Sequence, residues 1–283
     1  TNTYSGTGGL HQVYLGLGWS PFKGFAIGVN AAYLWGDYSR SVVNSYTDAY
    51  ANTLSKYYTA EVHNYKLDFG MQYTQKITKN DAITLGVTYG LGHKLSSDPK
   101  CQIISTNAQT AVADTATYSI GNGLELPHSY GVGLMWNHAN RWRVGADYTL
   151  QKWSSVAYPK FDTSTNSYEL VSGQFADRHK MTVGGEFCPD ERSRSFFKRV
   201  HYRMGASYAT DYLKIKGQNG PKEYSVSAGF GVPIVNGYNN RSLLNISAQW
   251  VRQDSKTFVT ENSFRINIGL TFNERWFAKW KME

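Results

Sequence analysis

The chain has 283 residues, of which 41% are hydrophobic, 15% aromatic and only 18% charged, and its formal net charge is +8. A chain rich in Tyr, Trp, Phe and Gly favours β-strands, because helical proteins use more Ala, Leu, Glu and Lys. No apolar run approaches the roughly 18 to 20 residues that a spanning helix needs. The basic residues form no cluster, so we expect no nucleic-acid partner.

Alternating apolar and polar residues predict about eleven β-strands. In one of them Leu85, Val87 and Tyr89 fall on one face, while Gly86 and Thr88 fall on the other. Each segment spans roughly ten residues or more, which suits a tilted membrane strand better than the roughly five or six residues usual in soluble sheets. In chain order the segments start near Gly9, Phe25, Glu61, Ala82, His128, Arg141, Arg178, Arg199, Tyr224, Ser242 and Phe264.

The last segment shows most clearly how the two faces differ. Phe264, Ile266 and Ile268 form an apolar face, and Arg265 and Asn267 form a polar one. A soluble barrel would have to pack the apolar side chains of eleven strands into one small interior, whereas a membrane barrel turns them towards lipid. The pattern therefore predicts an all-β fold, an antiparallel transmembrane β-barrel of a bacterial outer membrane. The alternative is a soluble β-sandwich whose core is capped by the aromatic residues.

The connections between strands differ in length and predict the orientation of the wall. Short links occur near Pro21, Asn80, Asn140 and Asn239, and they alternate with long polar stretches at residues 36–60, 96–126 and 154–174. Outer-membrane barrels have short periplasmic turns and long external loops. We therefore place the short links at the periplasm, together with the longer turn at residues 189–198.

An odd number of strands leaves the wall incomplete. Antiparallel bacterial barrels have an even number of strands, and an open edge in hydrocarbon would leave backbone groups without hydrogen bonds. The chain starts without an initiator Met or the pattern of a signal peptide, so its first residues read as the interior of a longer precursor. We expect residues 1–283 to form one barrel domain from which an odd number of N-terminal strands is absent.

The cysteine and histidine residues give no pattern for metal or cofactor binding. Cys101 and Cys188 are the only cysteines, they lack the paired spacing of a zinc site, and the seven His residues are scattered. The predicted topology places Cys101 and Cys188 on opposite sides of the membrane, so we expect no disulfide between them. We predict no metal site and no cofactor.

Three segments resemble the FadL/TodX family of outer-membrane transporters for hydrophobic compounds, in the form found in Bacteroidetes. They are FRINIGLTFNERWFAKWK at the C-terminal end, GGLHQVYLGLGWSPFKGFAIGVNAAYLWGD and EYSVSAGFGVPIVNGYNNRSLLNISAQWVRQ, which together cover somewhat under a third of the chain. The resemblance implies a fourteen-stranded barrel plugged by an N-terminal hatch. Three strands and the hatch, with its Asn-Pro-Ala motif, would then be absent from this chain, so no binding residue of the family is carried over.

The resemblance implies an outer-membrane channel for the uptake of long-chain fatty acids or other hydrophobic molecules, in contact with outer-membrane lipid. Charged residues on the polar strand faces are the candidate ligand-binding residues, because a guanidinium or ammonium group suits a carboxylate. More often such mixed charges pair among themselves. The candidates are Lys66, Asp68, Arg143, Asp147, Arg203 and Arg265.

Two other functions compete with transport. Members of the same family also serve as accessory subunits in protein secretion, so the barrel could be a non-transporting subunit or scaffold of an outer-membrane complex with protein partners. Its long external loops, with Tyr46, Tyr50, Tyr57, Tyr58 and Tyr118, would then bind the partner. An outer-membrane hydrolase is the third option, but His179 and His201 have no nucleophile motif beside them. We therefore expect no catalytic residues and no enzyme activity.

Overall fold

The computed structural model describes residues 1–283 except 49, 216, 237–238, 256–258 and 272–283. The second half of the run FRINIGLTFNERWFAKWK lies outside the described residues. Within the described part of the chain, none of the helices has the length and hydropathy needed to span a lipid bilayer.

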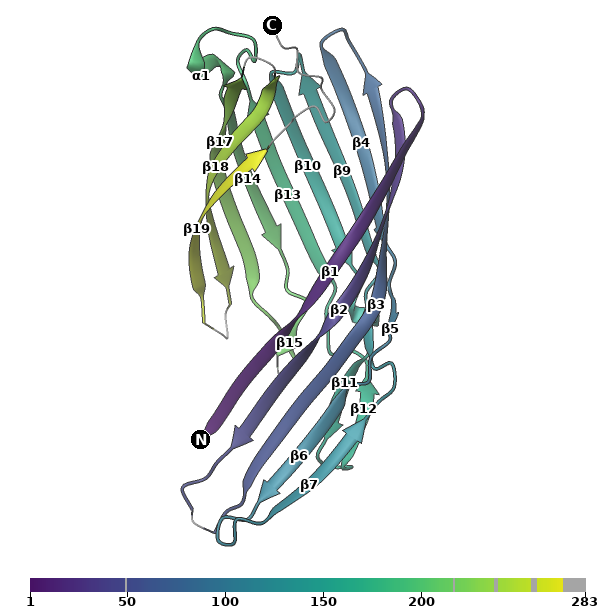
Figure 1. The fold of residues 1–283 in the computed structure, drawn as a ribbon, viewed down its shortest axis with the longest axis vertical. Helices are drawn as coiled ribbons and strands as arrows, with labels where there is room; N and C mark the ends of the chain where they lie inside the picture. The colour runs from purple at the N-terminus through teal and green to yellow at the C-terminus, as the bar shows by residue number, and fades with distance from the viewer. Residues whose placement is uncertain (49, 216, 237–238, 256–258, 272–283) are drawn as a thin grey trace, which may run out of the picture.

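One curved antiparallel sheet dominates the described residues, and its main path has eleven strands in chain order (Figure 1). This confirms the predicted number of strands and the all-β class. The strands on the path are β1 (Asn2–Phe22), β2 (Phe25–Asn44), β3 (Thr53–Lys76), β4 (Asp81–Gly90), β9 (Ser129–His138), β10 (Trp142–Gln151), β13 (Arg178–Phe187), β14 (His201–Ala209), β17 (Lys222–Asn236), β18 (Asn239–Asp254) and β19 (Glu261–Thr271).

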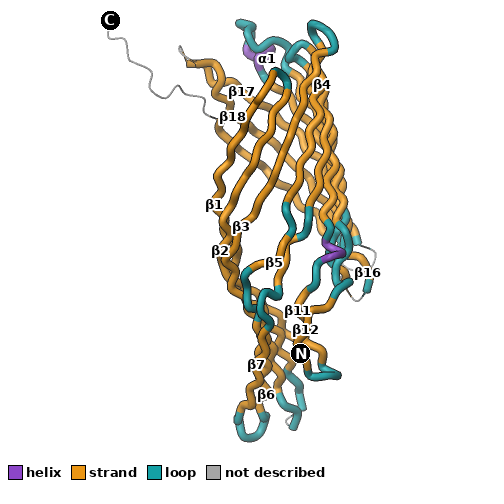
Figure 2. Tube along the Cα trace, turned by 90° about the vertical axis from the view of Figure 1, so that its right-hand side faces the viewer, coloured by secondary structure: helices purple, strands orange, loops and turns teal. Residues whose placement is uncertain are grey.

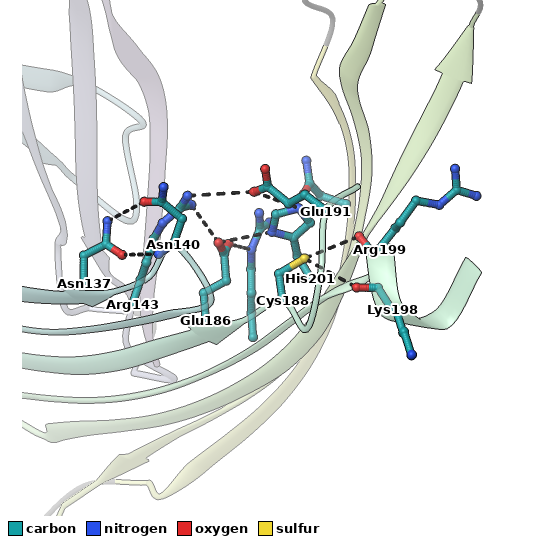
Figure 3. Close-up of polar contacts among 11 residues, drawn as sticks. Asn137, Asn140, Arg143, Glu186, Cys188, Glu191, Lys198, Arg199 and His201 are labelled. Atoms are coloured by element: carbon teal, nitrogen blue, oxygen red, sulfur yellow. Dashed lines mark hydrogen bonds and ion pairs between the residues drawn. The ribbon is translucent and has the colours of Figure 1, made fainter. Parts of the chain in front are cut away.

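The two faces of this sheet carry different side chains, as the alternation predicts. Apolar residues stand out from the convex face, where Leu85, Ile268 and Leu270 are 48%, 74% and 47% exposed. Cross-strand partners share this face, so Ile268 lies opposite Ile246. The concave face carries the charged residues of β10, β13 and β14 (Figure 3). So many exposed apolar side chains would be unfavourable in water, and they therefore fit a face that contacts lipid.

The two ends of the sheet have connections of different length, which also follows the prediction. We call the end with links 23–24, 77–80, 139–141 and 188–200 the turn edge, and the end with links 45–52, 91–128 and 152–177 the loop edge. Gly24, in the first link, has φ +86°, and a Cβ there would lie 2.5 Å from the carbonyl oxygen of Thr74. The longest link of the turn edge contains the short helix α1 (Phe196–Arg199).

The loop edge contains more regular structure than the sequence predicts. The first three strands are 21, 20 and 24 residues long, about twice what a membrane strand needs. The links of the loop edge contain η1 (Trp153–Ser155) and the strands β5 (His93–Leu95), β6 (Lys100–Thr106), β7 (Ala113–Ser119), β8 (Leu124–Leu126), β11 (Tyr158–Asp162), β12 (Ser167–Val171), β15 (Lys214–Ile215) and β16 (Gln218–Asn219). The period-two signal is weak in these stretches because neither face of these strands meets lipid.

Strands β6 and β7 pair beside the early part of β3, so the sheet continues past the wall as a narrower extension, shown at the bottom of Figures 1 and 2. Within the described residues, β1 pairs only with β2 and β19 only with β18, so this chain by itself leaves the sheet open. The three absent strands and the hatch stay predictions. Cys101, on β6, and Cys188, at the turn edge, are both free, as expected from their separation.

Candidate functional site

A charged cluster occupies the concave face of three adjacent strands near the turn edge. The register places Glu186 on β13 between Arg143 on β10 and Arg203 on β14. Arg143 Nη1 donates a hydrogen bond to Glu186 Oε1 at 2.8 Å, and Arg203 Nε donates one to Glu186 Oε2 at 2.6 Å. Figure 3 shows Arg143 and Glu186 converging in front of the sheet. One carboxylate therefore bridges two guanidinium groups from strands on either side of β13, and the three side chains together keep one positive charge.

Polar groups continue this cluster across the later strands. Arg203 Nη1 donates to Asn245 Oδ1 at 2.6 Å, and Asn245 Nδ2 donates to Thr271 Oγ1 at 3.2 Å. We call Arg143, Glu186, Arg203, Asn245 and Thr271 the polar belt. It links β10, β13, β14, β18 and β19 with hydrogen bonds between side chains, in addition to the backbone pairing. A belt of this kind stabilises the polar face of the wall, because pairing offsets the cost of removing these charges from water.

A second charged pair lies nearer the loop edge. Lys66 and Asp68 follow each other on the concave face of β3 and form an ion pair. Asp68 lies opposite Gly90, where an added Cβ would come 2.9 Å from its Oδ1. Strands β4 and β9 separate this pair from β10, so it is distinct from the polar belt.

The six candidate residues therefore divide into three groups. Arg143 and Arg203 meet at Glu186, whereas Lys66 and Asp68 pair with each other. Asp147 and Arg265 lie on the polar face, and among the described residues no ion pair joins either of them to a partner. Whether any of the six binds a ligand stays a prediction. Glu186 is not one of the six candidates, because the alternation within a single strand does not indicate that it connects two of them.

The grooves between apolar side chains lie on the convex face. One of about 680 Å³ is lined by Trp142, Val144, Phe187, Tyr202 and Met204, which alternate with the residues of the polar belt. Another of about 480 Å³ is lined by residues of β1 to β4 such as Trp19 and Phe69. Both grooves face the direction that we assign to lipid, so acyl chains are their natural occupants.

The turn after β13 brings together residues that the sequence did not connect. Cys188, Glu191 and His201 have ligand atoms within 4.8 Å of one another, beside Glu186 (Figure 3). Burial raises the pKa of the Cys188 thiol, and the nearby charges of Glu191 and Glu186 raise it further. No spacing motif could have indicated this cluster, because the whole turn separates Cys188 from His201.

Asp177 is the most strongly shifted carboxylate of the loop edge. Burial alone would raise its pKa, but the ion pair with Lys152 and hydrogen bonds from Ser154 outweigh this effect and lower the pKa to about 2. The backbone N–H of Ser154 donates to Asp177 Oδ1 at 3.0 Å. Asp177 therefore ties η1 to the start of β13.

Comparison with known proteins gives one family and a set of structural neighbours. A family model described as BamG matches residues 1–283. Among solved structures, the CymD monoaromatic hydrocarbon channel has a TM-score of 0.61 at 12% identity, covering 87% of this chain and 69% of CymD. The toluene transporter TbuX of Ralstonia pickettii has a TM-score of 0.60 at 12% identity, with 94% and 67% covered. No curated protein sequence matches the chain.

A FadL homologue of Pseudomonas aeruginosa is also similar, with a TM-score of 0.53 at 14% identity and coverage of 88% of this chain and 60% of that one. At such low identity these neighbours show the fold. They confirm the predicted antiparallel transmembrane β-barrel, and they confirm the FadL/TodX resemblance at the level of the fold. The matching family model has a different name, BamG.

Proposed function

The chain belongs to the BamG family, and we propose that it forms the wall of an outer-membrane channel for hydrophobic small molecules. The observation that carries this proposal is the shared barrel fold, since the neighbours CymD and TbuX are named a monoaromatic hydrocarbon channel and a toluene transporter. The apolar convex face and the charged concave face give additional support, because they suit a wall between lipid and a polar interior. In this orientation the turn edge faces the periplasm. The proposal involves no catalytic step.

The charges on the concave face bear on the class of molecule that passes. Arg143 and Arg203 already share Glu186, so a fatty-acid carboxylate would use their remaining N–H groups or compete with Glu186. A neutral hydrophobic molecule requires neither. We include long-chain fatty acids in the proposal as the finer alternative, with Arg143 and Arg203 as the groups that would meet the carboxylate.

Uptake into vesicles tests both levels of the proposal. Vesicles that contain the natural full-length protein should accumulate a neutral monoaromatic hydrocarbon faster than protein-free vesicles, and equal rates would refute the channel. The substitutions Arg143→Gln and Arg203→Gln should slow the uptake of a long-chain fatty acid and leave hydrocarbon uptake unchanged. Asp147→Asn is the control on the same face. If a folded Arg variant transports fatty acid at the wild-type rate, the arginines stabilise the wall and do not bind the fatty acid.

A second candidate function, a scaffold subunit of an outer-membrane complex, is favoured by the extension beyond the wall. Tyr46 and Tyr50 lie in the link between β2 and β3 and are 62% and 79% exposed. Tyr118 instead packs against Phe161, with ring centroids 5.2 Å apart. The exposed pair, and not Tyr118, is therefore available to a protein partner. Stoichiometric proteins that co-purify with the natural protein and are lost after Tyr46→Ala with Tyr50→Ala would favour the scaffold over the channel.

A further inference from the structure

The turn edge carries a cluster of metal-ligand groups directly beside the polar belt. Cys188 directly follows β13, Glu191 lies in the turn, and His201 begins β14. One ligand atom from each residue lies within 4.8 Å of the other two (Figure 3). Cys188 and His201 are only 2% and 7% exposed, so two of the three groups are held in place by the fold.

His201 has the surroundings of a metal ligand. Its Nδ1 is buried and makes no hydrogen bond of acceptable geometry, although Glu186 Oε1 lies 3.2 Å away. Its Nε2 is 3.9 Å from Glu191 Oε1, which is beyond hydrogen-bond distance. Metal-bound imidazoles commonly hold a carboxylate at one nitrogen and the metal at the other. Glu186 lies beside the first nitrogen, Nδ1, and Nε2, which is near Glu191, is left for a metal.

The Cys188 thiol has weak partners in the fold. Its Sγ lies 3.8 Å from the carbonyl oxygens of both Lys198 and Arg199. The carboxylate of Glu191 is on a half-exposed side chain, and Arg143 Nη2 lies 4.0 Å from its Oε1. Arg143 keeps its shorter bond to Glu186 if Glu191 turns towards a metal. The three ligand atoms lie within 4.8 Å of one another, so small movements of these side chains would place them around one ion.

We propose that Cys188, Glu191 and His201 bind one Zn²⁺ ion at the turn edge. Thiolate and imidazole ligands favour zinc over the hard cations Mg²⁺ and Ca²⁺, which prefer oxygen. Zn²⁺ accepts Sγ at about 2.3 Å and Nε2 at about 2.0 Å in tetrahedral geometry, and a water molecule completes the fourth position. Cys188 loses its thiol proton to solvent when the metal binds. The ion would connect β13, the turn and β14, whatever passes through the barrel.

Zinc titration of the metal-free natural protein tests this site. The wild-type protein should bind one Zn²⁺ per chain, with protection from thermal unfolding, and Co²⁺ in place of Zn²⁺ should give thiolate-to-metal charge-transfer absorption. Cys188→Ser should abolish the binding and the absorption. Cys101→Ser is the matched control, because Cys101 is the other buried free cysteine and should leave both intact.

Two further variants keep the test decisive if Cys188→Ser folds poorly. Glu191→Gln changes an exposed turn residue and should weaken Zn²⁺ binding without loss of folding. Glu186→Gln leaves the three ligands in place and should weaken binding roughly 10- to 100-fold, as loss of the carboxylate behind a ligating histidine does. Absence of stoichiometric Zn²⁺ on the wild-type protein would overturn the site, as would equal affinities of the Cys188→Ser and Cys101→Ser proteins. An unchanged affinity of Glu191→Gln would overturn it as well.

Discussion

The substitution Glu186→Gln tests whether the polar belt stabilises the wall. It keeps the shape of the side chain and removes the charge that Arg143 and Arg203 share. Each of the two charge-assisted hydrogen bonds contributes roughly 1.5 to 3 kcal/mol when well shielded. The guanidinium groups are more than a third exposed, so we halve the sum and expect a loss of about 2 kcal/mol in the free energy of unfolding.

Urea unfolding of the natural protein in lipid vesicles, followed by tryptophan fluorescence, measures this loss. Asp147→Asn is the control, because Asp147 lies on the same face and no ion pair joins it to another described residue. Its free energy of unfolding should change by less than about 0.5 kcal/mol, the usual range for substitutions away from a specific interaction. If Glu186→Gln is as stable as the wild type, or if Asp147→Asn loses as much, the belt is not a stabilising network.

Three further predictions concern the rest of the wall. Gly36 has φ +145°, and an added Cβ would lie 2.2 Å from a backbone oxygen. Gly36→Ala should therefore lower the free energy of unfolding, measured in urea, by about 1 to 3 kcal/mol. Gly9→Ala, where the added Cβ meets open space, should lower it by less than half as much. In lipid, Ile266→Lys should lower the free energy of unfolding by about 2 to 4 kcal/mol, and Asn267→Lys should lower it much less. The reverse order would show that the two faces are assigned wrongly. The folded-state pKa of Asp177 is lowered to about 2, so this carboxylate stabilises the fold fully above about pH 4 and loses its effect as the pH falls towards 2. The stability of Asp177→Asn, measured over the same pH range, should lack this loss. Identical profiles for the variant and the wild type would refute the prediction.

The extension at the loop edge shows where sequence patterns stop being informative. The alternation in β19 is visible in the sequence because lipid and a polar interior impose opposite demands on its two faces. Beyond the wall, both faces of β6 and β7 meet water or other loops, so apolar and polar residues no longer alternate strictly. The late part of β2 and the early part of β3 therefore fall in the loop predicted at residues 36–60, whereas the structure shows them as strands. The same reason explains why Tyr118 was expected on a free surface and instead packs on Phe161.

The sequence by itself determined the strands of the wall, the face that each side chain occupies and the two kinds of connection, because all three depend on residues close together in the chain. Only the tertiary structure decided which side chains meet. Glu186 joins Arg143 and Arg203, and Cys188 lies beside His201, because the register between strands and the path of the turn bring them together. Register is set by pairing along whole strands and by turn geometry, so the alternation within one strand cannot indicate it.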